Sequence, residues 1–229
     1  MIPIHDLNPR RTPPVVTVAL IVVNALFFLY ELSLGQRIDG FFQTVAFIPA
    51  RAGDGLPEAA GSALVSMFLH GGWAHLLGNL LFLWVFGDNV EDRLGHFRFL
   101  LFYLLAGYAA TGAHYAFSPG STIPAIGASG AISGVLGAYL FLHPKARIVT
   151  VVWLFVFLKL IEIPALVYLP IWFGLQLLSG LTSLGAESAA SGGVAWWAHI
   201  GGFVAGPVLL LLLGGRRDPP EPERRRLVW

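Results

Sequence analysis

Long stretches without a charged residue are the feature that most constrains how this chain can fold. Five of them make up most of the sequence: residues 12–30, 59–87, 99–144, 163–186 and 188–215. Each can supply a helix of about 20 residues across about 30 Å of hydrocarbon, and the stretch 99–144 can supply two. Only 12% of all residues are charged, which is about half of the fraction usual in soluble domains. The pattern predicts a polytopic membrane protein.

Six membrane-spanning helices are expected in these stretches. We place them at about residues 14–32, 73–89, 97–117, 127–143, 164–181 and 195–213. Segment 147–163 is not counted as a crossing, because its apolar core, Ile148 to Leu158, has 11 residues and is too short to span. Pro164 would end any continuation of that segment, so we expect it to be interfacial or re-entrant. The predicted fold class is an all-α membrane protein with a six-helix bundle.

The chain divides into one membrane domain with short flanking segments. The domain covers residues 14–213 and includes a long outer loop at 33–72. Residues 1–13 form an N-terminal segment, and the tail 214–229, rich in Pro, Glu and Arg, is expected to be disordered. The chain has no cysteine, which excludes disulfides, thiolate ligands and a cysteine nucleophile.

Basic residues are distributed unequally between the two sides of the predicted bundle. With six crossings, twelve of the Lys and Arg residues fall on one side, and Arg37 and Arg51 alone fall on the other. The positive-inside rule then places both termini in the cytoplasm. The short N-terminus without an Arg- and Ser-rich presequence favours a prokaryotic plasma membrane. Because the basic residues are spread over several loops, the net charge of +1 does not indicate nucleic-acid binding.

Polar groups at membrane depth are costly, and four of them are candidates for function: His75, Asn79, Ser129 and His199. The second, fourth and sixth predicted helices run in the same direction. His75, Ser129 and His199 each lie near the outer start of one of these helices, of order 5–10 Å deep at 1.5 Å rise per residue. The three side chains are therefore expected at a similar depth.

Ser129 lies among small residues, in Gly127-Ala128-Ser129-Gly130. A serine at a helix start is accessible to a substrate, and nearby helix-start amides can donate to an oxyanion. In the alternative interpretation, Gly130 and Gly134 form a helix-packing face and Ser129 is one more small residue on it.

His199 shares one helical face with Gly202 and Gly206, which suits close approach of another helix. A neutral imidazole at this position can accept the serine proton and return it to the leaving amine. A purely structural histidine, hydrogen-bonded to a neighbouring helix, is the alternative. No Asp or Glu is expected at that depth, so the pair would act as a Ser-His dyad without the carboxylate of a triad.

His75 and Asn79 lie one helical turn apart and are candidate oxyanion donors. Hydrogen bonding between helices is the alternative role for both side chains. The sequence contains no His-Glu-x-x-His motif, and the histidines fall at different depths, so neither a metal nor a cofactor is expected.

The combination of His75-x-x-x-Asn79, Gly127-Ala128-Ser129-Gly130 and Ala198-His199-x-x-Gly202-x-x-x-Gly206, in this order, resembles the rhomboid intramembrane serine proteases. Glu91-Asp92-Arg93-Leu94-Gly95 is also similar to the family. The resemblance implies that Ser129 is the nucleophile and His199 the general base. It also implies an oxyanion pocket formed by Asn79, His75 and the Ser129 amide.

The expected substrates are transmembrane helices of other membrane proteins, cut where small or helix-breaking residues allow local unwinding. A non-catalytic rhomboid-like binding module or a transporter remains the alternative, although no internal repeat supports a transporter. Some rhomboids carry a tyrosine four residues after the nucleophile, where this chain has Ser133. The group that orients His199 is therefore left open by the sequence.

Overall fold

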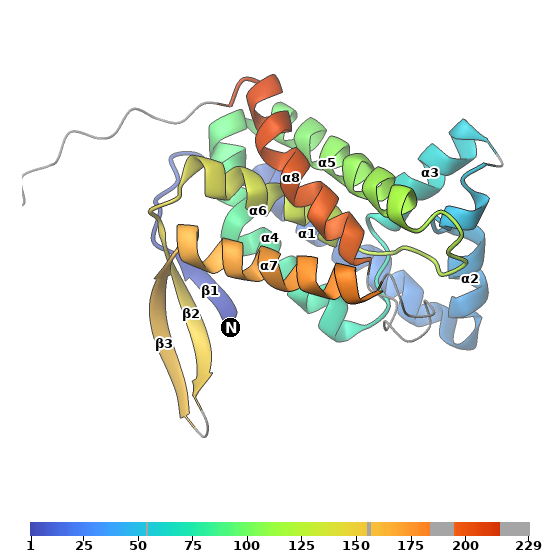
Figure 1. Ribbon diagram of the computed structural model, residues 1–229, viewed down its shortest axis with the longest axis horizontal. Helices are drawn as coiled ribbons and strands as arrows, with labels where there is room; N and C mark the ends of the chain where they lie inside the picture. The colour runs from blue at the N-terminus through green and yellow to red at the C-terminus, as the bar shows by residue number, and fades with distance from the viewer. Residues whose placement is uncertain (54, 155–156, 184–194, 216–229) are drawn as a thin grey trace, which may run out of the picture.

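A computed structural model describes residues 1–53, 55–154, 157–183 and 195–215. Its helices are α1 (Val15–Leu34), α2 (Ile38–Val45), α3 (Leu56–Ser66), α4 (Trp73–Leu94), α5 (His96–Phe117), α6 (Ser129–Leu142), α7 (Ala165–Ser183) and α8 (Trp196–Leu212), with short 3-10 turns at Gly35–Arg37 and Pro49–Arg51. Its strands are β1 (Ile2–Asp6), β2 (Arg147–Leu154) and β3 (Phe157–Pro164). All six predicted long helices are present, as α1 and α4 to α8, and they lie roughly along the long axis of the molecule (Figure 1).

The expectation of an all-α protein is wrong for two segments. Segment 147–163, predicted to be interfacial or re-entrant, forms the antiparallel hairpin of β2 and β3, and part of the N-terminal segment 1–13 adds β1 to it. The hairpin is rich in β-branched and aromatic residues, which favour strands over helices. The sequence signal for β1 was weaker than that for the hairpin, because a strand of five residues forms only when it pairs with a segment that is distant in the sequence.

The predicted outer loop, residues 33–72, is largely helical. It contains α2, α3 and both 3-10 turns, which lie at the end of the molecule opposite to the sheet (Figure 1). Within the tail 214–229, residues 216–229 lie outside the described residues, so the expected disorder there stays a prediction.

Helix α6 lies inside the bundle, with eleven of its fourteen residues buried. Glycines permit this position. A Cβ built on Gly202 would overlap the carbonyl oxygen of Gly130, and one built on Gly206 would overlap that of Gly134. On another side of α6, a Cβ on Gly134 would lie 2.6 Å from the Cβ of Ala106 in α5. The backbones of α5, α6 and α8 therefore approach closely, as small residues allow in membrane helices.

Carboxylates of α4 hold the start of α1. Helix α1 has no capping side chain of its own after Pro14. Glu91 instead accepts hydrogen bonds from the amides of Val16 and Thr17, at 2.8 and 2.7 Å. Because the first amides of a helix lack partners within it, a buried carboxylate from another helix stabilises this end. The Glu91 motif thus has a structural role far from Ser129.

Large apolar side chains cover the outside of the bundle. Leu26 and Leu29 on α1, Leu175 and Leu178 on α7 and Val208 on α8 are each more than half exposed. Two helical stretches, Val15–Val45 and Ala165–Thr182, are long and apolar enough to cross a membrane by length and composition. A surface of this kind is unfavourable in water and suits contact with lipid.

Candidate active site

Ser129 is the first residue of α6, and the loop before it is held in place by α3. Ser66 of α3 accepts the Gly127 amide on its carbonyl oxygen at 2.9 Å and the Phe47 amide on its hydroxyl at 2.7 Å. Gly127 has φ of +125°, which L side chains rarely adopt. Ser129 therefore follows a turn that needs glycine, and its own amide has no carbonyl partner earlier in the helix.

The Oγ of Ser129 lies 2.7 Å from the Nε2 of His199, although the two residues are 70 positions apart. His199 is in the first turn of α8, and Ser129 begins α6. The glycine contacts between these two helices bring their starts to the same level. Two residues that the sequence predicted at equal depth are thus within hydrogen-bonding distance.

The other nitrogen of His199 has a partner that the sequence analysis missed. Its Nδ1 lies 2.7 Å from the Oε1 of Gln176 on α7. Because a glutamine Oε1 can only accept, the proton is on Nδ1, and Nε2 keeps the lone pair that faces Ser129. Gln176 is the one Asn, Gln or charged residue in the sequence of α7, so its polarity at membrane depth was an available signal.

Two indole rings flank His199. The ring centroids of Trp172 and Trp196 each lie 6.1 Å from that of the imidazole. Ser133, at the position where some rhomboids have tyrosine, instead donates its hydroxyl to the carbonyl oxygen of Ser129 at 2.6 Å. The orientation of His199 thus comes from α7 and α8, and the hydroxyl of Ser133 is engaged within α6.

His75 and Asn79 both border the space in front of Ser129. A Cβ built on Gly127 would lie 2.6 Å from the Nε2 of His75 and 3.5 Å from the Oγ of Ser129. The amide nitrogen Nδ2 of Asn79 is buried and has no hydrogen-bond partner among the described residues. A buried donor without a partner is unfavourable unless a ligand or water satisfies it.

A cavity of about 1000 Å³ opens in front of these side chains. Residues of α4, α6, α7 and α8 line it, among them His75, Asn79, Ser129, Gln176 and His199. Its volume is at the upper end of the range usual for ligand sites.

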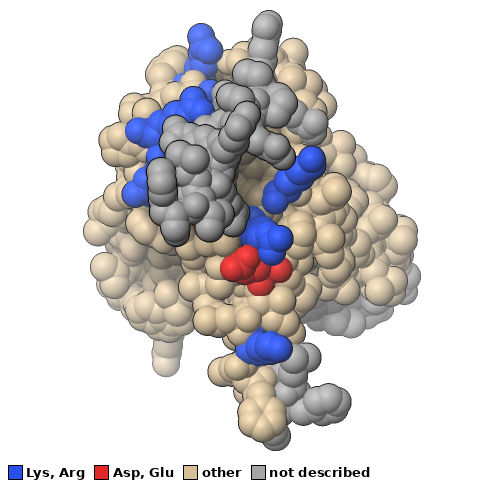
Figure 2. Space-filling view, turned by 90° about the vertical axis from the view of Figure 1, so that its left-hand side faces the viewer, with Lys and Arg blue, Asp and Glu red and all other residues tan. Residues whose placement is uncertain are grey.

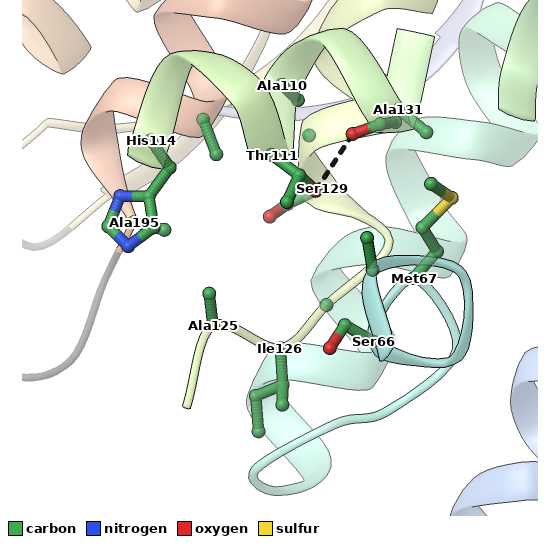
Figure 3. A pocket seen from close by; sticks show the side chains of 15 residues that line it. Ser66, Met67, Ala110, Thr111, His114, Ala125, Ile126, Ser129, Ala131 and Ala195 are labelled. Atoms are coloured by element: carbon green, nitrogen blue, oxygen red, sulfur yellow. Dashed lines mark hydrogen bonds between the residues drawn. The ribbon is translucent and has the colours of Figure 1, made fainter. Parts of the chain in front are cut away.

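A second, much smaller cavity of about 30 Å³ lies beside Ser129. Figure 3 shows Ser129 on its wall together with Thr111 and His114 of α5 and Ala195. A space of this size holds one water or a methyl-sized group.

Among the described residues, no group of three or more His, Asp or Glu side chains is arranged to hold a metal ion. The rings of His70 and His75 are neighbours, with centroids 5.2 Å apart, but no carboxylate completes a ligand set with them in that part of the chain.

The structure combines a helical bundle that has an apolar surface with a serine–histidine pair that faces a cavity. These features are those of a membrane protein with a hydrolase-type site. Comparison with protein families specifies the class further: a model described as the Rhomboid domain matches residues 59–216. The chain belongs to the rhomboid family, whose members are integral membrane proteins.

Several relatives are similar to parts of this chain. "Rhomboid protease GluP" of Bacillus subtilis is 38% identical over 53% of the chain and 23% of its own length. "Rhomboid-like protein 11, chloroplastic" of Arabidopsis thaliana is 33% identical over 49% of the chain and 40% of its own length. "Rhomboid protein 1, mitochondrial" of Saccharomyces cerevisiae is 35% identical over 42% of the chain and 28% of its own length. The similarity therefore spans less than half of each of these relatives.

Proposed function

We propose that this protein is an intramembrane serine endopeptidase that cleaves transmembrane segments of other membrane proteins. The observation that carries the proposal is the 2.7 Å distance between the Oγ of Ser129 and the Nε2 of His199. Membership of a family that includes serine proteases, such as the relative named GluP, supports it.

In the proposed first step, Ser129 attacks the carbonyl carbon of the scissile peptide bond. Its hydroxyl proton passes to the Nε2 of His199, and the imidazolium then protonates the leaving amine as the peptide C–N bond breaks. A water molecule next attacks the acyl carbon and gives a proton to the same nitrogen. The ester bond to Oγ then breaks, the imidazolium returns its proton to Oγ, and the new carboxyl end leaves. Gln176 keeps the imidazole in the tautomer that both steps need.

The oxyanion of the tetrahedral intermediate would lie between the start of α6 and α4. The unpaired Nδ2 of Asn79, the amide of Ser129 and the Nε2 of His75 are the candidate donors. Donors that are already oriented stabilise the charge as it develops, and each is worth about 3–4 kcal/mol in well-studied hydrolases.

The cavity of about 30 Å³ beside Ser129 bears on substrate preference. It has room for a methyl group or a water but not for a leucine or phenylalanine side chain. Small residues at the cut also favour the local unwinding that exposes a helical peptide bond. Substrates with alanine or glycine at the scissile bond are therefore favoured.

For topology, we retain six crossings with both termini in the cytoplasm, in a prokaryotic plasma membrane. On the side of the bundle away from Ser129 lie Arg93 at the end of α4, Arg98 at the start of α5, Lys145 in the turn after α6 and Arg147 at the start of β2. We call this side the basic end. Figure 2 views it directly and shows Lys and Arg gathered on it. The positive-inside rule places such an end in the cytoplasm.

Labelling with a serine-directed fluorophosphonate tests the proposal. The detergent-solubilised wild type is expected to be labelled at Ser129 and to cleave a helical membrane substrate, whereas Ser129→Ala and His199→Ala abolish both. Ser33→Ala is the matched control, because Ser33 is exposed and bonded to the carbonyl of Tyr30. Wild type that is neither labelled nor cleaves substrate would instead support a non-catalytic binding module. Cleavage that persists in folded Ser129→Ala would rule out Ser129 as the nucleophile.

A further inference from the structure

The β2–β3 hairpin projects away from the helical bundle at the basic end (Figure 1). Its strands pair along their whole length, from Arg147 opposite Pro164 to Leu154 opposite Phe157. Among the described residues, β1 pairs only with the base of β2, from Ile148 to Val151. The base is buried, since Ile148 and Thr150 have no exposed surface. The outer half of the hairpin therefore extends beyond the support of the bundle.

The outer half is apolar and exposed on both faces. Phe157, Leu158 and Leu160 expose 73%, 67% and 63% of their surface. Residues directly opposite each other share a face, so Leu158 and Leu160 lie on one face with Trp153 and Val151, whereas Phe157 lies on the other with Lys159. A two-stranded ribbon of this kind has no core of its own and is at best marginally stable in water.

We propose that this outer half, residues 152–153 and 157–160, docks into the lipid headgroup and upper acyl region of the membrane leaflet at the basic end. The first argument is continuity with the lipid-facing surface. β3 ends at Pro164 and α7 begins at Ala165 with no connecting residue. The first outward residues of α7, Leu166 and Val167, are exposed and apolar like the hairpin. The apolar surface of α7 thus continues directly into the hairpin.

The second argument is the placement of charge. Lys159 is the only charged residue of the outer half, and the exposed pair of Arg147 and Glu162, 3.3 Å apart, lies near its base. Lysine and tryptophan are both favoured at the headgroup level, where an apolar stem and a polar end are satisfied together. The basic end also attracts anionic headgroups, because Lys and Arg near the surface are drawn to the negative potential of such a leaflet. A lipid surface therefore matches both the apolar and the charged parts of the hairpin.

Measuring how deep spin-labelled hairpin residues lie in the membrane tests the proposal. Because the chain has no cysteine, a single introduced cysteine is the only site that takes the label. Phe157→Cys and Leu158→Cys, each carrying a nitroxide label, sample the two faces in phospholipid vesicles that contain anionic lipid. Leu175→Cys on exposed α7 is the lipid reference, and Lys145→Cys in the exposed turn before β2 is the water reference. Relaxation by oxygen, which partitions into lipid, is compared with relaxation by a polar nickel complex.

Both hairpin labels are expected to be relaxed more by oxygen than by nickel, as at position 175 and opposite to position 145. Nickel-dominated relaxation at both hairpin labels would place the hairpin in water and overturn the proposal. Protection from both reagents, with spin–spin broadening between copies, would show that a second copy covers the hairpin, which also overturns it.

Two further variants keep the test independent of any effect of the label. Leu160→Asp in the Phe157→Cys protein is expected to shift the label towards the nickel reagent, because a carboxylate is costly in the acyl region. Lys159→Gln is expected to weaken the dependence of label depth on the anionic lipid fraction, with Arg37→Gln as the control at the other end. An unchanged depth in Leu160→Asp would contradict contact with lipid. None of these measurements depends on proteolytic activity.

Discussion

Gln176 and His199 are joined by a 2.7 Å hydrogen bond between the Oε1 of the amide and the Nδ1 of the imidazole. The bond links α7 to α8 and gives the histidine a neutral partner where a Ser-His-Asp triad has a carboxylate. An amide sets the tautomer as a carboxylate does, but it offers no negative charge to the imidazolium. Gln176 is thus a positioning residue for the proposed reaction.

Replacing Gln176 by leucine is expected to lower kcat by about tenfold to a hundredfold, the usual effect of removing such a supporting partner. Gln176→Glu keeps an acceptor and is expected to retain activity. Because a carboxylate favours the charged imidazole, the acid limb of its pH–rate profile should move to higher pH. Initial rates over a pH series measure both effects. Equal kcat in the leucine variant and the wild type would remove Gln176 from this role.

Asn79→Ala is expected to reduce kcat by about tenfold to a hundredfold, with a smaller change in KM, because its donor acts on charge that develops in the transition state. His75→Ala should act in the same direction, and the double variant should lose more than either single one. Asn8→Ala, at the basic end, serves as the control. A purely structural role for Asn79 would lower the thermal stability and leave kcat of the folded fraction unchanged.

Gly202→Ala is expected to destabilise the protein by about 1–3 kcal/mol, because its Cβ would overlap the carbonyl oxygen of Gly130. Moving α8 away from α6 would also separate Ser129 from His199 and lower activity in the folded fraction. In Gly112→Ala the new Cβ has no atom within 4 Å, so a neutral or slightly stabilising effect is expected. Thermal unfolding in detergent compares the two. Equal stability of both variants would contradict the importance of the close helix contact.

Asp6 should make the stability of the basic end depend on pH. Its carboxylate accepts hydrogen bonds from Tyr139 at 2.6 Å and from Asn89 at 3.0 Å. Burial raises the pKa of Asp6 to about 6, and the hydrogen bond from Tyr139 offsets part of this effect. Because the pKa is higher in the folded state than in the unfolded chain, the stabilising contribution is complete below about pH 4. It is lost as the pH rises through about 6.

Asp6→Asn keeps an acceptor for Tyr139 and removes this titration. Relative to the variant, the wild type is expected to lose about 2 kcal/mol of stability between pH 4.5 and pH 7. The difference in Tm between the two proteins, measured at both pH values, reports the effect. Asp39→Asn, at an exposed position, controls for general charge effects. A Tm difference that does not change with pH would show that Asp6 has no raised pKa.

Much of the helical architecture could be predicted from local sequence. The six long helices follow from uncharged stretches whose length matches a bilayer, and this signal needs no knowledge of neighbouring segments. The direction of the predicted helices was enough to place Ser129 and His199 at one level. The hairpin of β2 and β3 was harder, because an apolar run of 11 residues fits an interfacial helix or a strand equally well.

The sequence by itself determined which segments are apolar helices, which small residues permit close contact, and which polar groups lie near Ser129 in depth. The tertiary structure alone decided which side chain faces which. It turned Gln176 towards the Nδ1 of His199, placed His114 on the small cavity and paired β1 with a strand more than 140 residues away. The reason is physical: hydropathy sets the depth of a residue in its own helix, whereas its neighbours depend on how each helix is rotated and packed.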